Sequence, residues 1–106
     1  MHVVDLADGH LKALEYLEAG GTTTSINLGT GIGSSVLEVV AATERASGRA
    51  VPYELKARRP GDPVALWSDT GRSASVLGWT ARYNLDDILG SAWAWHSTHL
   101  DGYAAT

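Results

Sequence analysis

The sequence predicts an α/β fold with about four helices and few short strands. Apolar residues recur at helical spacing in several segments, two short runs are rich in β-branched and apolar residues, and glycines separate these segments. The expected order is helix, strand, helix, strand, helix, helix. Because two strands alone rarely make a stable sheet, this order also indicates that the chain is part of something larger.

The first helix is expected from about Asp5 to Leu17, with Asp5 as its N-cap. Its apolar stripe consists of residues at helical spacing: Leu6, His10, Ala13, Leu14 and Leu17. The glycines of "EAGGTTT" end this helix. The run "SINL", residues 25–28, then has the composition of a short buried strand.

The second helix follows the tight turn "GTGIG", residues 29–33. Ser35 and Glu38 have the spacing of a capping box at its start, and Gly48 is placed to end it. The run "VPYELKA", residues 51–57, alternates loosely and is expected to be the second strand.

Two helices are expected in the last third of the chain. The first runs from about Thr70 to Leu77 and stops at Gly78. The second begins after Asn84, its expected cap, with acids in the first turn at Asp86 and Asp87. Its stripe comprises Leu85, Ile88, Leu89, Ala92 and His96, flanked by Trp93 and Trp95.

Composition excludes several classes of function. The chain of 106 residues carries 12 acidic and 8 basic side chains, which argues against a nucleic-acid partner. No apolar run approaches the roughly 18 residues that a membrane span needs, so we expect no membrane partner. The absence of cysteine and the acidic start, which is unlike a signal peptide, favour a cytoplasmic protein.

The turn "GTGIG" resembles the phosphate-binding turns of dinucleotide sites. Such a fingerprint opens the first β-α unit of its fold and is followed about 20 residues later by an acid. Here a helix precedes the turn, and the next strand carries Glu54, which comes late. We therefore expect the glycines to serve backbone geometry, with a cofactor site as the alternative.

The loop "RRPGDP", residues 58–63, is the most informative polar stretch. The guanidinium groups of Arg58 and Arg59 can bind phosphate in a fork geometry, and Asp62 can accept hydrogen bonds from sugar hydroxyls. Two prolines stiffen the loop and lower the cost of ordering it. The alternative is a solvated loop in which an arginine and an aspartate form a surface ion pair, and such a pair contributes little to stability.

Two further pairs are weaker. His96 and His99 have the spacing of a metal pair on a helix, but no third ligand follows, so we expect a packed or partly buried pair and no metal site. Tyr53 and Lys56 are three residues apart on an expected strand. Their side chains would face opposite sides, so they are not an activated dyad.

Four segments together resemble, in order and spacing, the C-terminal part of bacterial UDP-glucose 4-epimerase, an extended short-chain dehydrogenase/reductase. They are "HVVDLADGHLKAL", "INLGTGIGSSVLEVV", "RRPGDPVALWSD" and "LGWTARYNLDDILGSAWAWHSTHLDGY". The resemblance covers His2 to about Tyr103. It implies an isomerase of galactose metabolism that interconverts UDP-glucose and UDP-galactose with NAD.

The resemblance also implies that cofactor and substrate are bound by different parts of the full-length enzyme. In the full-length family an N-terminal Rossmann domain holds NAD, and a smaller C-terminal region holds the UDP-sugar. The family's NAD glycine loop and its catalytic Tyr-x-x-x-Lys pair do not occur here. Residues 1–106 are therefore expected to be a partial domain that binds UDP-sugar weakly or not at all alone, with no catalytic residue and no bound NAD.

Two residues carry over from the family's nucleotide loop. Arg59 matches the arginine that contacts the UDP phosphates, and Asp62 matches the aspartate that accepts hydrogen bonds from the ribose. Leu66 stands where the family often has tyrosine, so one substrate contact is expected to differ.

The family usually reads Arg-Asp-Tyr-Ile-His-Val before the first helix, and Met1 stands in place of the isoleucine. We expect a truncated or split epimerase that is inactive by itself. The alternatives are a nucleotide-sugar binding module and a subunit that completes a separate Rossmann chain; a homodimer is a further possibility. The first helix and the "SINL" run are expected to pack against the missing half, which leaves apolar surface exposed here.

Overall fold

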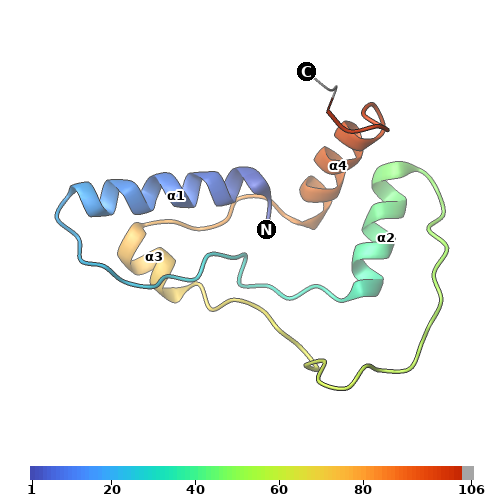
Figure 1. Ribbon diagram of the computed structural model, residues 1–106, viewed down its shortest axis with the longest axis horizontal. Coiled ribbons are helices and arrows are strands. Elements are labelled where there is room, and N and C mark those ends of the chain that lie inside the picture. The colour runs from blue at the N-terminus through green and yellow to red at the C-terminus, as the bar shows by residue number, and fades with distance from the viewer. Residues whose placement is uncertain (104–106) are drawn as a thin grey trace. The chain divides into compact units, whose positions relative to one another are not determined.

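The computed structural model describes residues 1–103, which form four helices joined by long irregular segments (Figure 1). The helices are α1 (Val3–Glu18), α2 (Val36–Ser47), α3 (Gly71–Leu77) and α4 (Leu85–His96). The expected order of helices is confirmed. None of the four, within residues 1–103, is both long and apolar enough to cross a membrane.

The two expected strands are absent, so the α/β prediction is wrong for the described part of the chain. Residues 25–28 and 51–57 are irregular, and no segment within residues 1–103 pairs with either as a strand. A strand is defined by hydrogen bonds to a neighbour, and sequence composition alone does not supply that neighbour.

The described residues divide into two compact units. Unit 1 comprises residues 1–33 and 58–84 and contains α1 and α3. Unit 2 comprises residues 34–57 and 85–103 and contains α2 and α4. Each unit has its own packing.

Helix α1 begins three residues earlier than a cap at Asp5 would allow, so the prediction of that cap is wrong. His2 is the N-cap, and its Nδ1 accepts a hydrogen bond from Val4 N at 3.1 Å. Asp5 lies in the first turn and is fully buried. Its two carboxylate oxygens accept hydrogen bonds from the backbone N–H groups of Arg82 and Tyr83, each at 3.1 Å. Through these two hydrogen bonds, Asp5 connects α1 to the segment that follows α3.

The core of unit 1 is small and lies on one face of α1. Trp79 is only 2% exposed, and Leu28 approaches the helix at Gly9. A Cβ atom at Gly9 would lie 2.6 Å from Leu28 Cδ1, so any other residue there would require the Leu28 side chain to move. The expected apolar stripe of α1 instead remains largely uncovered: Leu6, Leu14 and Leu17 are 39%, 57% and 51% exposed.

Helix α3 follows Thr70 and ends at Gly78, as expected. Gly78 is left-handed, with φ 61°, and its N–H donates to the carbonyls of Ser73 and Ala74. A left-handed glycine of this kind satisfies carbonyls that the last helical turn leaves unpaired.

Helix α2 carries the predicted capping box. Ser35 Oγ accepts a hydrogen bond from Glu38 N at 3.2 Å, and Glu38 Oε2 accepts one from Ser35 N at 2.7 Å. The carboxylate of Glu38 is stabilised first by the hydrogen bond from the backbone N–H of Ser35 and then by the side chain of Ser35, and both lower the pKa of Glu38 below its ordinary value. The helix ends at Gly48, which has φ 66°, so this end is also predicted correctly.

Helices α2 and α4 pack against each other in unit 2. Ala42 is fully buried, and Arg45 Nη2 forms an ion pair with Asp86 Oδ1 at 2.6 Å. The guanidinium of Arg49 lies 5.5 Å from the ring centroid of Trp93. The apolar stripe of α4 is half-buried, except that its last member, His96, is exposed.

Candidate functional site

The glycine turn packs tightly against residues 67–70 of the same unit. A Cβ atom at Gly29 would lie 2.6 Å from Ser68 Cβ, and one at Gly33 would lie 3.3 Å from the ring of Trp67. Gly31 has φ +72° and lies close to Thr70. The glycines therefore serve backbone geometry and close packing, as the sequence predicted.

This packing does not fit a dinucleotide. A phosphate-binding turn needs glycines so that the backbone can approach a pyrophosphate. Here the space beside the glycines is filled by residues of the chain itself: Trp67, Ser68 and Thr70. The turn therefore leaves no room for a dinucleotide phosphate beside its glycines.

The predicted nucleotide loop, residues 58–63, forms a turn around Gly61, which has φ +88°. Asp62 N donates a hydrogen bond to Arg59 O at 3.3 Å and closes the turn. Arg59 Nε lies 3.2 Å from Asp62 Oδ2, so the two predicted site residues form an ion pair. The structure thus brings Arg59 and Asp62 together at one turn.

The loop is solvated. The side chain of Arg59 is 85% exposed and that of Asp62 is 44% exposed, and Leu66 nearby is also exposed. Residues 52–67 are all exposed, so no other part of residues 1–103 covers this loop. The loop therefore forms at most one side of a binding site. This arrangement agrees with the surface-pair alternative, and it leaves both charged groups accessible to a ligand.

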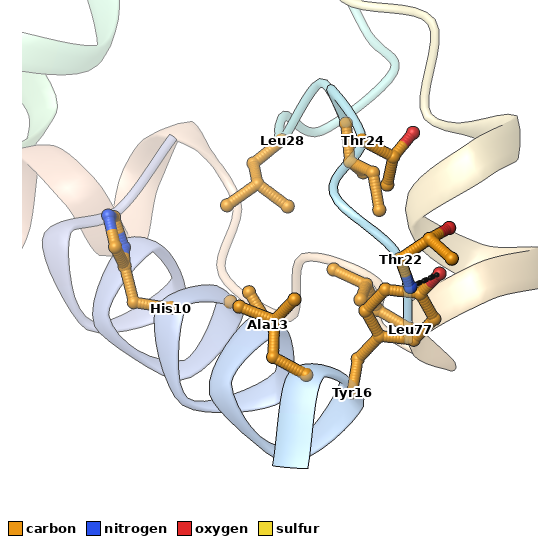
Figure 2. Close-up of a pocket in the computed structure, with 10 residues that line it drawn as sticks. His10, Ala13, Tyr16, Thr22, Thr24, Leu28 and Leu77 are labelled. Carbon is orange, nitrogen blue, oxygen red and sulfur yellow. Dashed lines mark hydrogen bonds between the residues drawn. The ribbon is translucent and has the colours of Figure 1, made fainter. Parts of the chain in front are cut away.

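Unit 1 also contains an apolar groove of about 240 Å³ that the sequence did not reveal (Figure 2). It lies between α1, residues 22–28 and the end of α3. Its lining residues are Gly9, His10, Ala13, Tyr16, Leu17, Thr22, Thr24, Ile26, Leu28 and Leu77. The Oη atom of Tyr16 accepts a hydrogen bond from Thr22 N at 3.2 Å at one end of the groove (Figure 2).

The groove reveals the geometry of residues 22–28. Every second residue of this segment lines it: Thr22, Thr24, Ile26 and Leu28. A period of two is the side-chain period of a β-strand. The segment therefore turns one face to the groove as a strand does, although no strand partner lies within residues 1–103.

Arg72 of α3 holds this segment in place. Its Nη1 donates to Ser25 O at 2.9 Å, and its Nη2 donates to Thr24 Oγ1 at 2.7 Å. Sequence reasoning missed this residue because the contact joins positions 47 and 48 residues apart. A lone arginine in a short helix gives no signal of such a distant partner.

The two histidines lie around Trp95 at the end of α4. The ring of His99 stacks on Trp95 at 4.7 Å, and the ring of His96 meets it edge-on at 4.8 Å. Both histidines are exposed, so the pair is not partly buried, but each ring packs against Trp95 as the packed alternative predicts. No group of three or more His, Cys, Asp or Glu side chains within residues 1–103 could hold a metal ion.

Comparison with known proteins finds enzymes that each contain a segment similar to this chain. No model of a protein family matches the chain. The UDP-glucose 4-epimerase of Bacillus subtilis is 45% identical over 103 residues, which are 97% of this chain and 30% of that enzyme. The chain is homologous to a part of UDP-glucose 4-epimerase. The enzyme of Rhizobium leguminosarum bv. trifolii is also 45% identical, over 92% of this chain and 30% of its own length.

Solved structures of UDP-glucose 4-epimerases contain a part whose fold is similar to that of this chain. The Bifidobacterium longum epimerase, in complex with NAD+ and UDP, matches with a TM-score of 0.84 and 40% identity over 97% of this chain. The Stenotrophomonas maltophila epimerase, with NAD and formylated UDP-arabinopyranose, matches with a TM-score of 0.89 and 37% identity over 94% of this chain. The chain spans about 30% of the length of each of these epimerases.

Proposed function

We propose that the chain is the C-terminal, UDP-sugar-binding region of a UDP-glucose 4-epimerase, and that Arg59 and Asp62, in the loop of residues 58–63, contact the nucleotide. Arg59 binds the UDP phosphates, and Asp62 accepts hydrogen bonds from the ribose hydroxyls. The observation that carries the proposal is the exposed pair of these two side chains at one turn, with Nε 3.2 Å from Oδ2. The homology supports it, because the B. longum relative binds UDP in its crystal structure.

The ion pair is suited to exchange with a ligand. An exposed pair contributes little to stability, so separating Arg59 from Asp62 costs little. A diphosphate offers the guanidinium anionic oxygens that it can bind in a bidentate, charge-assisted geometry. The freed Asp62 repels phosphate but accepts hydrogen bonds from hydroxyls, which orients the diphosphate toward Arg59 and the ribose toward Asp62.

We further propose that the 106-residue chain does not catalyse epimerisation by itself. The reaction needs an acceptor for the hydride of the sugar and a base for the proton of its hydroxyl. The family's NAD glycine loop and Tyr-x-x-x-Lys pair, which supply them, do not occur in the sequence. Conversion of UDP-galactose by the pure chain with added NAD, above a blank, would contradict this.

A second candidate function is that of a subunit that completes a separate Rossmann chain. The exposed leucines on α1 favour it, because an isolated globular unit usually buries the apolar stripe of its helices. This candidate is compatible with the nucleotide site, since the second chain would supply the walls that residues 58–63 lack.

Replacement of Arg59 by alanine tests the nucleotide assignment. A hydrogen bond to a charged group contributes about 1.5–3 kcal/mol, so R59A should weaken UDP binding about tenfold or more. R58A is the matched control, because it removes the same charge one residue earlier in the loop. It should change binding less than about threefold, since a charge without direct contact is screened by solvent.

Calorimetric titration of UDP into the two variants and the unchanged chain gives the comparison. Equal weakening in both variants would mean that only the net charge of the loop attracts UDP. Unchanged binding in R59A would remove Arg59 from the site.

A further inference from the structure

The segment that joins α2 to α3 contains the longest continuously exposed stretch within residues 1–103. Residues 52–67 are all exposed, and this stretch is free of helix and strand (Figure 1). An endoprotease needs several successive residues of accessible backbone, which is why cleavage of folded proteins concentrates in exposed loops. Residues 52–67 therefore have the backbone that such an enzyme requires.

Basic side chains in this stretch supply a recognition signal for proteases of the trypsin class. Lys56 and Arg58 are each followed by a bond that these enzymes cut, whereas the bond after Arg59 leads into Pro60, which blocks them. The chain has eight basic residues. The other five lie in helices or beside backbone held by hydrogen bonds: Lys12, Arg45, Arg49, Arg72 and Arg82.

A cut in this stretch falls between the two compact units along the chain. Hydrolysis after Arg58 gives two pieces, residues 1–58 and 59–106. Unit 1 combines residues 1–33 of the first piece with residues 59–84 of the second, and unit 2 combines residues 34–57 with residues 85–103. Each unit is therefore assembled from both pieces, and the cut separates neither pair of packed helices.

In unit 1, buried and charged hydrogen bonds join the two pieces. The carboxylate of Asp5 on the first piece accepts hydrogen bonds from the backbone N–H groups of Arg82 and Tyr83 on the second, each at 3.1 Å. Arg72 Nη1 on the second piece donates to Ser25 O on the first at 2.9 Å. Asp5 is fully buried, so water does not compete readily for its bonds.

In unit 2, helix packing joins the same two pieces. Helix α2 of the first piece packs against α4 of the second, and Arg45 Nη2 lies 2.6 Å from Asp86 Oδ1. Each piece thus takes part in two separate contact areas on one chain. When one area is formed, the other forms as an intramolecular step, so the two together hold the pieces more tightly than either does alone.

We propose that the bonds after Lys56 and Arg58 are a proteolytic modification site, at which an endoprotease specific for basic residues cuts the folded chain into two pieces that stay together. At Arg58 the C–N bond to Arg59 breaks and water is consumed: the carbonyl carbon gains hydroxyl, and the nitrogen of Arg59 gains hydrogen. This inference goes beyond the proposed function and does not depend on it, because neither cleavage nor assembly involves UDP.

Timed digestion of the native chain with a low concentration of trypsin, followed by mass spectrometry, locates the first cut. Cleavage after Lys56 or Arg58 should be at least about tenfold faster than cleavage after Arg45 or Arg72, because a helix must open before its bonds are accessible. The double variant K56Q/R58Q should be cut at least about tenfold more slowly. R49Q is the matched control and should be cut as fast as the unchanged chain.

A protease of the chymotrypsin class tests whether irregular backbone, and not the basic side chains alone, determines the site. It cuts after large apolar residues, and exposed ones occur both in this stretch, at Tyr53 and Leu55, and on α1, at Leu11 and Leu14. Cleavage after Tyr53 or Leu55 should be at least about tenfold faster than cleavage after the two helical leucines.

Gel filtration and NMR of the trypsin-treated chain test whether the pieces stay together. Both pieces should elute in one peak at the volume of the uncut chain, and should separate only in denaturant. The amide signals of Arg82 and Tyr83 should keep their positions, because their bonds to Asp5 remain. A first cut outside residues 52–67, equal cutting of K56Q/R58Q and R49Q, or elution of the pieces as separate peaks would overturn the proposal.

Discussion

Removal of the Asp5 carboxylate should lower the free energy of unfolding of unit 1 more than any substitution on the surface of that unit. Asp5 is fully buried, and its side chain joins the first turn of α1 to a segment about eighty residues later in the chain. The substitution Asp5→Ala leaves two backbone N–H groups, those of Arg82 and Tyr83, without their acceptor. It also removes a negative charge from the N-terminal turn of a helix, where the helix dipole favours one.

The size of the effect follows from these contacts. Each hydrogen bond to a charged acceptor contributes about 1.5–3 kcal/mol, and water can reach the partly exposed N–H groups and recover some of this loss. We therefore expect Asp5→Ala to lower the free energy of unfolding by about 2–4 kcal/mol. Asp5→Asn keeps one acceptor oxygen and should cost about half as much. The 3.9 Å contact between Asp5 and Arg82 Nε adds little, because Arg82 is largely exposed.

Urea unfolding followed by residue-resolved NMR at positions 3–18 and 73–79 measures this change. Asp8→Asn is the matched control, because Asp8 also faces Arg82, at 3.8 Å, but is 35% exposed. It should change the free energy of unfolding by less than about 0.5 kcal/mol. Equal effects of Asp5→Ala and Asp8→Asn would refute the role given to the buried carboxylate.

Two further predictions concern the glycines and the capping box. G29A should destabilise the chain by about 1–3 kcal/mol, because its Cβ would lie 2.6 Å from Ser68 Cβ. G90A, in open space within α4, should stabilise it by up to about 1 kcal/mol; urea midpoints that rank the two variants the other way would contradict the packing. The pKa of Glu38 is lower in the folded chain than in the unfolded chain. The Glu38 carboxylate therefore stabilises the fold at a pH above the pKa of an unfolded glutamate, and this stabilisation is lost as the pH falls through the pKa of Glu38 in the folded chain. S35A should raise that pKa only in part, because the backbone N–H bond remains, and carbon-detected NMR titration of the Glu38 carboxyl would show no change if the hydroxyl were irrelevant.

Local signals in the sequence predicted local structure. Helices begin or end where the chemistry of four residues requires it: Ser35, Glu38, Gly48 and Gly78. Each of them acts on backbone groups within five residues of itself. The glycine turn was also interpreted correctly from its position after a helix.

Distant contacts were not predictable in this way. Asp5 is of a residue type that commonly serves as an N-cap, but its carboxylate oxygens accept hydrogen bonds from N–H groups 77 and 78 residues away. His2 caps the helix instead. The "SINL" run has strand periodicity, yet a strand needs a neighbour that no segment within residues 1–103 provides. Arg59 and Asp62 could be predicted as neighbours at a turn, whereas the groove depends on three segments that meet only in the folded chain.

We propose above all that the loop of residues 58–63 binds the nucleotide through Arg59 and Asp62. The most direct test is a proton–nitrogen NMR spectrum of the labelled chain, recorded with and without millimolar UDP. We expect a dispersed spectrum in which the amide signals of Arg59 and Asp62 shift most and those of the groove residues do not shift. A spectrum that UDP leaves unchanged, or one whose shifts are confined to the groove, would contradict it.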